Sequence, residues 1–400
     1  MQGNWSLATM VLTTISNSLL SQPLEVGTEP FAYASGYSHQ FAVSADGKRF
    51  AVCGYEAQNK PGHAVLKGGC VVWNIADRKR ISIGKMDAGA YQVAISPNGK
   101  FVALGGDSGI VPRGMGVYEG SVELRLFDAD TGKRTANLDG HVSGFGAGKL
   151  AFTPDSKYLL SLASDNMIRV WTVADHKPHA KYCFRTEAFF ANDWQRWTDR
   201  PQEKAKINVI HEAKIDRVWS FDVSPDGHLL AVATGTADVP LLEPLSGKLI
   251  DRVRCDKIKK CREASFSSDG QVMIVWGWVK TEEDDGKGQH FTEVWQVRPR
   301  KLIGILENVC SQPASLSPDK RFLVASDPSG VGIWDLTTRS LRNRLLVNGE
   351  ESSWTLRGTS FLPDGKSFVT LADDLGAVDN VRSIQLWSLE TGKKVDQPKR

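Results

Sequence analysis

The chain has 400 residues, of which 41% are hydrophobic and 24% charged. This is the composition of an ordinary folded protein and argues against intrinsic disorder. The 49 basic residues nearly balance the 46 acidic ones, and no long block of one sign is present. A dedicated nucleic-acid binder or acidic-membrane binder is therefore not expected. No stretch is long and apolar enough to cross a bilayer as a helix.

The first charged residue is Glu25. Residues 5–20 are mildly apolar, but no basic residue precedes them, Ser, Thr and Asn interrupt them, and no A-x-A cleavage pattern follows. We therefore interpret residues 1–25 as a disordered leader, with a secretory signal as the alternative. A cytoplasmic location is favoured, and a secreted or periplasmic one stays open.

Six cysteines stand at positions 53, 70, 183, 255, 261 and 310. None forms a C-x-x-C motif and no pair of His has zinc-ligand spacing, so neither a metal site nor a cofactor is expected. Cys53 with Cys70, and Cys255 with Cys261, are the candidate disulfide pairs. Free thiols are the favoured alternative.

A short pattern recurs seven times, in which apolar residues are followed by a small residue, an acid or amide, and a turn residue. The acid or amide positions are Asp46, Asn98, Asp155, Asp226, Asp269, Asp319 and Asp364. Their mean spacing is about 53 residues, the length of one supersecondary unit. Asp-Gly between two apolar runs is a strong hairpin signal, because Gly adopts the positive φ that a tight turn requires.

Each turn is followed by a second apolar run, a third strand and a polar turn that leads into a fourth strand. The third strand usually ends in an aromatic residue, at Trp73, Phe127, Trp171, Trp295, Trp334 and Trp387. A single four-stranded antiparallel sheet cannot bury both of its faces, whereas seven arranged radially bury each face against a neighbour. The repeat therefore predicts an all-β, seven-bladed β-propeller.

The seventh unit lacks an outer strand at the C-terminal end of the repeats. Residues 26–33 precede the first repeat and alternate in polarity, and Pro30 is compatible with an edge strand. We expect this segment to complete the seventh blade and close the ring. Residues 26–396 would then form one propeller domain.

The third unit runs from Gly140-His141 through Leu150-Ala-Phe-Thr-Pro to the strand that ends at Trp171. It resembles the WD40 repeat family of β-propellers, and the resemblance extends over nearly all of residues 26–396. It implies a buried hydrogen-bond network formed by His141, Ser161, Asp165 and Trp171. The literal Trp-Asp pair occurs only at Trp334-Asp335, so a TolB-like or lactonase-like propeller is the alternative fold.

The repeats exceed the usual WD40 length, and the additional residues lie in specific connections. They fall between second and third strands, at 54–69, 105–121, 277–291 and 372–382, and in an insertion near 185–214 that joins the third blade to the fourth. In an up-and-down sheet these connections emerge on the same side. We call this side the elaborated rim and expect function there, with neutral lengthening of surface loops as the alternative.

The insertion near 185–214 has a helical pattern that starts at Thr186 and stops before Pro201. Phe190, Trp194 and Trp197 fall on one face of this helix, with Arg196 beside it. Aromatic residues with Arg are typical of interaction hot spots, which makes these four the candidate partner-binding residues. The alternative is that the aromatic face packs onto the disc as a cap.

No nucleophile elbow, Cys–His signature or carboxylate pair stands out in the sequence. The resemblance to WD40 proteins implies a non-catalytic scaffold that binds a protein or peptide, here on the elaborated rim. We expect no nucleic-acid partner and a propeller that is monomeric on its own. An enzyme of the propeller type, lactonase-like or dependent on a metal in the central channel, is the alternative.

Overall fold

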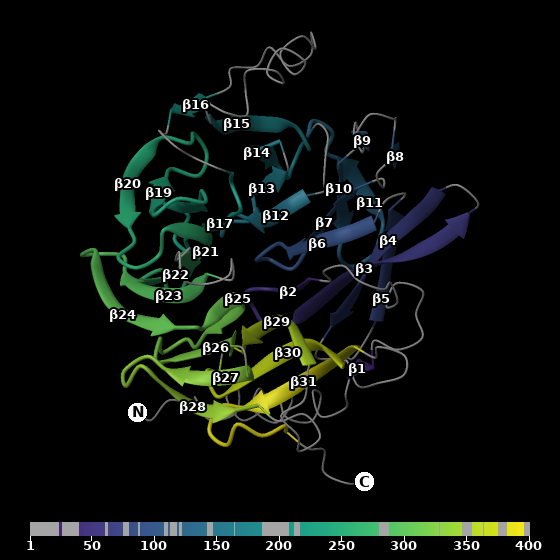
Figure 1. The fold of residues 1–400 in the computed structure, drawn as a ribbon. Helices are drawn as coiled ribbons and strands as arrows, with labels where there is room; N and C mark the ends of the chain where they lie inside the picture. The colour runs from purple at the N-terminus through teal and green to yellow at the C-terminus, as the bar shows by residue number, and fades with distance from the viewer. Residues whose placement is uncertain are drawn as a thin grey trace, which may run out of the picture.

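The computed structural model shows seven sheets arranged in a ring around a central axis (Figure 1). The described residues are 24–25, 40–60, 63–74, 80–86, 89–107, 111–112, 118–119, 122–141, 147–163, 165–185, 208–211, 217–279, 288–327, 329–345, 354–362, 364–374 and 382–395. This part of the chain is all β and contains no helix. The predicted seven-bladed propeller is confirmed.

The first four blades follow the chain order. Blade 1 contains β2 (Phe41–Val43), β3 (Arg49–Lys60), β4 (His63–Asn74) and β5 (Arg80–Met86). Blade 2 contains β6 (Gly89–Ile95), β7 (Phe101–Asp107), β10 (Val122–Asp128) and β11 (Arg134–Asn137). Blade 3 contains β12 (Ala147–Phe152), β13 (Tyr158–Ala163), β14 (Met167–Thr172), β15 (Pro178–Arg185) and β16 (Asn208–His211). Blade 4 contains β17 (Ser220–Val223), β18 (Leu230–Ala233), β19 (Asp238–Leu242) and β20 (Leu249–Arg254).

The last three blades complete the ring. Blade 5 contains β21 (Lys260–Phe266), β22 (Val272–Val279), β23 (Gln289–Gln296) and β24 (Lys301–Glu307). Blade 6 contains β25 (Cys310–Leu316), β26 (Phe322–Asp327), β27 (Gly330–Asp335) and β28 (Ser340–Arg344). Blade 7 contains β29 (Trp354–Phe361), β30 (Ser367–Asp374), β31 (Arg382–Ser388) and β1 (Leu24–Glu25).

The turn between the first and second strands of each blade is built from the repeated motif. In blade 4, Ser224 Oγ donates to Asp226 Oδ1 (2.5 Å) and accepts a hydrogen bond from the Leu229 backbone N–H (2.8 Å). Gly227 has a φ of 74°, which glycine adopts without a steric penalty. The hydroxyl-to-carboxylate or hydroxyl-to-amide bond recurs at Ser44–Asp46, Ser96–Asn98, Thr153–Asp155, Ser267–Asp269 and Ser317–Asp319. The repeat therefore marks tight hairpins, as the sequence predicts.

Among the described residues, the hydrophobic core forms seven clusters, each between two neighbouring blades. Alternate side chains of one strand go to opposite interfaces. In β26, Phe322 and Val324 join the cluster shared with blade 7, whereas Leu323 and Ala325 join the one shared with blade 5. The cluster between the last and first blades contains Phe50, Val52, Leu362, Val369, Leu371 and Leu386. Each blade thus buries its two faces only when both neighbours are present.

The N-terminal part of the chain contributes the short strand β1, in which Leu24 and Glu25 pair with Ile384 and Ser383 of β31. The segment that the sequence assigns to this position, residues 26–33, lies outside the described residues. Closure of the ring by that segment stays a prediction, as does the leader for residues 1–23. Leu24 and Glu25, which the sequence assigned to the leader, belong to β1 instead.

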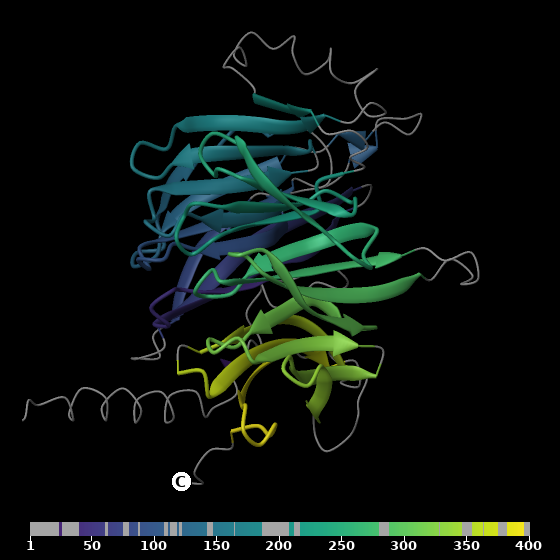
Figure 2. The same cartoon turned by 90° about the vertical axis from the view of Figure 1, so that its left-hand side faces the viewer.

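Several predicted loops on the elaborated rim are extended hairpins. The strands β3 and β4 remain paired out to Lys60 and His63 and project beyond the disc (Figure 1). Between β7 and β10 the chain forms a further small hairpin, β8 (Val111–Pro112) with β9 (Tyr118–Glu119). Seen edge-on, this hairpin and the paired ends of β22 and β23 lie on the same side of the disc (Figure 2).

The insertion near 185–214 contains a strand that the sequence did not predict. The strand β16 pairs in parallel with β15, from Tyr182–Asn208 to Arg185–His211, and gives blade 3 a fifth strand. Parallel neighbours require a long crossover connection, which accounts for the length of the insertion. The predicted helix falls within 186–207, outside the described residues.

Substituting Leu323 by Ala tests the dependence of each blade on its neighbours. Leu323 is 0% exposed in the interface between blades 5 and 6, so its truncation should lower the free energy of unfolding by about 2–4 kcal/mol. Unfolding in urea, followed by circular dichroism, should remain a single transition. Leu249→Ala, at a side chain that is 38% exposed, is the control and should change stability by less than about 0.5 kcal/mol. Two separate transitions in Leu323→Ala would contradict mutual support between blades.

Candidate functional site

The four residues of the predicted network meet in blade 3. His141 Nδ1 lies 3.0 Å from Asp165 Oδ2, and His141 Nε2 lies 2.8 Å from Ser161 Oγ. Trp171 Nε1 donates to the same Ser161 oxygen (2.9 Å). Burial opposes ionisation of Asp165, but His141 and the nearby Arg169 hold its pKa below the usual range. Because all four are buried, the network ties the loop that enters blade 3 to its second and third strands and leaves no reactive group on the surface.

Blade 5 contains a different buried network that also holds an entering loop against the third strand. The sequence analysis did not predict it. Glu293 is 0% exposed and accepts hydrogen bonds from the backbone N–H groups of residues 256, 257 and 258, at 3.1, 2.7 and 3.0 Å. Trp295 Nε1 donates to the same carboxylate (2.9 Å). A carboxylate thus replaces the His and Ser of blade 3. The available signal was a Glu two residues before a strand-end Trp.

Aromatic and basic side chains from blades 4 and 5 meet on the elaborated rim. The Arg262 guanidinium lies 3.4 Å from the centroid of the Trp219 ring, and that of Arg217 lies 5.0 Å from it. Lys260 Nζ lies 5.5 Å from the Trp278 ring centroid. We call these five residues the Arg–Trp cluster. Cations stacked on indole rings are held in place without losing their charge, so the cluster presents a rigid, positively charged aromatic surface.

Unpaired polar atoms lie beside this cluster, on blade 5. The rings of Trp276 and His290 are stacked, with centroids 5.7 Å apart and an interplanar angle of 4°. Trp276 Nε1, His290 Nδ1 and Glu263 Oε2 are buried and have no hydrogen-bond partner among the described residues. Glu263 is the strand partner of Trp276, which places the three groups on one face of the blade. Such groups are costly unless a ligand or water satisfies them.

Charged side chains from the inner strands of blades 3, 4 and 5 lie close together. Lys149 Nζ lies 3.5 Å from Glu263 Oε1, a contact from blade 3 to blade 5 past the inner strand of blade 4. Asp222 accepts hydrogen bonds from the backbone N–H groups of Phe266 (2.8 Å) and Val223 (3.0 Å). Burial raises the pKa of Asp222 to about 6, with Lys149 opposing the rise. Burial also opposes the charge of Lys149, but attraction to Glu263 and Asp222 outweighs it and raises the pKa of Lys149.

The candidate partner-binding residues of the insertion, Phe190, Trp194, Arg196 and Trp197, lie outside the described residues and remain a prediction. The strands that flank them, β15 and β16, form the outer edge of blade 3. Within the described residues, no group of three or more His, Cys, Asp or Glu side chains is placed to hold a metal ion.

Cys53, Cys70, Cys255 and Cys261 are buried and form no disulfide. Cys53 and Cys70 stand directly opposite each other on β3 and β4, and Cys255 and Cys261 share the core cluster between blades 4 and 5. Burial raises the pKa of Cys70, Cys255 and Cys261. Thiols in this state are poor nucleophiles, so they act as small apolar core residues.

Replacing Glu293 by Gln keeps the shape of the blade 5 network and removes its negative charge. The four hydrogen bonds to the carboxylate should weaken, lowering the free energy of unfolding by about 1–3 kcal/mol. Amide hydrogen exchange at residues 256–258 should accelerate, as measured by mass spectrometry. Glu307→Gln, at an exposed site on the next strand, is the matched control. Equal protection of residues 256–258 in the two variants would show that Glu293 does not anchor this loop.

The pH dependence of stability should report on Asp222. Its pKa is higher in the folded state, so stability falls as the pH rises from about 4 to about 6, and the loss is complete above 6. Asp222→Asn removes this loss and should stabilise the protein by about 1 kcal/mol at pH 7.5, with little change at pH 4.

Asp226 provides a control of opposite sign. Burial opposes its ionisation, but hydrogen bonds from Ser224 and His228 lower its pKa. It therefore contributes stability above about pH 4 that is lost as the pH falls, and Asp226→Asn should destabilise the protein at pH 7.5. Urea unfolding at several pH values measures both variants. A loss of stability in Asp222→Asn at pH 7.5 would contradict the account.

Comparisons with known proteins agree with this geometry. The family model described as "WD domain, G-beta repeat" matches residues 132–172, the stretch that holds the network of blade 3. A chain of the solved structure titled "Crystal Structure of Mitotic Checkpoint Complex" superposes with a TM-score of 0.59 at 13% sequence identity, covering 93% of this chain and 95% of that chain. In the described part of this chain, no helix has the length and hydropathy of a membrane span. The chain thus contains a WD40 repeat at residues 132–172 and folds as a seven-bladed β-propeller.

Proposed function

We propose that the protein is a non-catalytic scaffold that binds a protein or peptide partner on the elaborated rim. WD40 propellers are generally protein-interaction scaffolds. In this chain, the main support for the proposal is the Arg–Trp cluster on blades 4 and 5. Trp and Arg are the residue types that most often dominate binding energy at protein interfaces.

The chemistry of the rim indicates which partner groups it would bind. Arg217, Lys260 and Arg262 supply positive charge over two indole faces, which favours an acidic segment that also brings an apolar or aromatic side chain. Trp194 and Trp197 of the insertion are proposed as further contacts with the partner.

Charge reversal on the rim tests the proposal. Partners recovered with the wild-type protein are identified, purified and measured by titration calorimetry. The variant Arg217→Glu/Lys260→Glu leaves both Trp side chains in place and should weaken binding at least about 30-fold, as expected for the loss of hot-spot contacts.

The control for this test is Arg134→Glu, an exposed residue that follows a tight turn on the opposite rim. It should bind the partner as the wild type does. If the purified partner binds both variants equally well, or if the Arg134 variant alone loses binding, then the elaborated rim is not the binding surface.

A further inference from the structure

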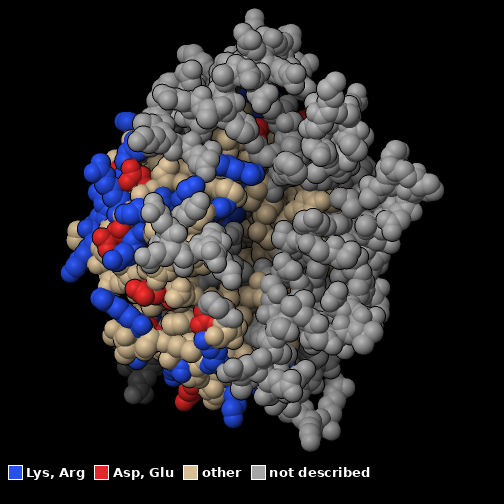
Figure 3. Space-filling view, viewed as in Figure 1, with Lys and Arg blue, Asp and Glu red and all other residues tan. Residues whose placement is uncertain are grey.

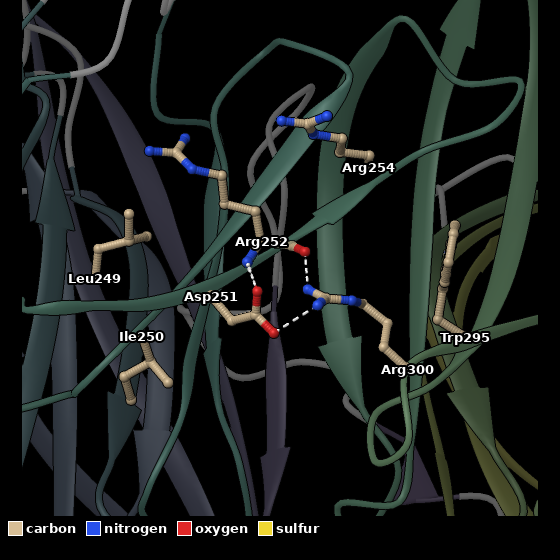
Figure 4. A pocket seen from close by; sticks show the side chains of 7 residues that line it. All are labelled: Leu249, Ile250, Asp251, Arg252, Arg254, Trp295 and Arg300. Carbon is tan, nitrogen blue, oxygen red and sulfur yellow. Dashed lines mark hydrogen bonds and ion pairs between the residues drawn. The ribbon is translucent and has the colours of Figure 1, made fainter.

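A second surface lies on the circumference of the disc, between the outer parts of blades 4 and 5. A hollow of about 610 Å³ is lined by side chains from β20, from β23 and from the turn before β24, namely Leu249, Ile250, Asp251, Arg252, Arg254, Trp295 and Arg300. We call it the side groove. Blades diverge with distance from the axis, so their outer strands leave a wedge-shaped space. In this wedge, Leu249 and Ile250 lie on one side of the Asp251–Arg300 pair and Trp295 lies on the other (Figure 4).

Two of the exposed apolar side chains of the described residues line the side groove. Among the described residues, the large hydrophobic side chains that are exposed are Leu249 (38%), Ile250 (52%) and Ile303 (37%). The first two line the groove and Ile303 lies on the facing strand β24. Exposed apolar groups gathered at one place, rather than scattered, mark an interaction surface.

The charge around the groove is mostly positive. Arg300 pairs with the one acidic residue of the lining, Asp251, at 2.7 Å. Arg254 is 82% exposed, and its Nε lies 4.0 Å from Asp238 Oδ1 on the neighbouring strand β19. Arg252 adds a second cation on the same strand. Lys and Arg side chains also gather over this outer edge of the disc (Figure 3). An occupant with negative charge on either side of an aliphatic side chain would complement it.

The backbone of β20 restricts how such an occupant binds. Pro240 stands opposite Arg252 in the neighbouring strand and has no N–H, so the polar backbone groups of Arg252 turn outward. Asp251 accepts a hydrogen bond from the Arg252 N–H (2.8 Å), and Arg300 donates to the Arg252 carbonyl. These contacts block the strand edge at this point. A partner would therefore be held by its side chains rather than as an added strand.

From these contacts we infer that the side groove binds an extended acidic peptide segment of a partner protein, with a Leu, Ile or Val side chain packed on Leu249 and Ile250 and its carboxylates facing Arg252 and Arg254. The β20 strand is six residues long, or about 17 Å from end to end, which fits a segment of about five residues. This surface is separate from the elaborated rim, so the inference does not depend on the proposed function.

The test uses a random-peptide phage library selected on the full-length protein. Selected sequences should carry an aliphatic residue flanked by Asp or Glu. A fluorescein-labelled synthetic copy of one such peptide is then measured by fluorescence anisotropy. Its affinity should fall at least about 10-fold in Arg252→Glu/Arg254→Glu and in Ile250→Ser.

Two variants should bind this peptide as the wild type does. They are Lys133→Glu/Arg134→Glu, which reverses two exposed charges beside the outer strand of blade 2, and the rim variant Arg217→Glu/Lys260→Glu. Melting temperatures within about 2 °C of the wild type establish that each variant is folded. Arg254→Glu alone, at a highly exposed side chain, keeps the test valid if the double variant does not fold.

Several outcomes would overturn the inference. One is a selection that enriches no acidic-aliphatic sequence, and another is a peptide that binds the Arg252/Arg254 variant as tightly as the wild type. Loss of peptide binding in the rim variant would move the site to the elaborated rim. Binding of labelled duplex DNA that depends on Arg252 and Arg254, or self-association of the wild type that these substitutions abolish, would assign the groove to a different occupant.

Discussion

The burial of each sheet against two neighbours is the constraint on which the rest of this structure depends. The seven core clusters all lie between blades, so the apolar side chains on both faces of a blade are removed from water only in the assembled ring. This explains why alternate residues of β26 belong to different clusters. The loops that enter the blades also contribute to these clusters, with Val218 before β17 and Ile258 before β21.

Buried polar groups anchor the loops that enter blades 3 and 5. The anchoring groups are a His and a Ser in one blade and a carboxylate in the other. In blade 3, His141 and Ser161 connect the entering loop to Trp171, whereas in blade 5 the Glu293 carboxylate binds three backbone N–H groups and Trp295. In blade 7, Trp387 Nε1 donates to Thr370 (2.8 Å). The Trp at the end of the third strand is the shared element, and its partner varies.

Local signals explain what the sequence could predict. The Asp-Gly turns and the apolar runs around them are contiguous in the chain, so the blades and their number follow from the spacing. The network of His141 and Trp171 follows from the resemblance, because its members occupy fixed positions in one repeat.

The remaining features depend on contacts between distant residues. The contact of Lys149 with Glu263 spans 114 positions, and the stacking of Arg262 on Trp219 joins two blades. The side groove arises from the divergence of two outer strands. The strand β16 pairs with β15 across a 22-residue connection, and the length of that connection alone does not predict a fifth strand. No periodic pattern of residues within a single segment predicts these contacts.

Native-state hydrogen exchange followed by mass spectrometry tests the central claim, mutual burial around a closed ring, most directly. The account predicts that the slowest-exchanging amides of the second strands in all seven blades, from β3 to β30, open with one common free energy, because loss of any blade exposes the faces of two others. A blade whose second strand exchanges at a much lower free energy, while the other six stay protected, would contradict it.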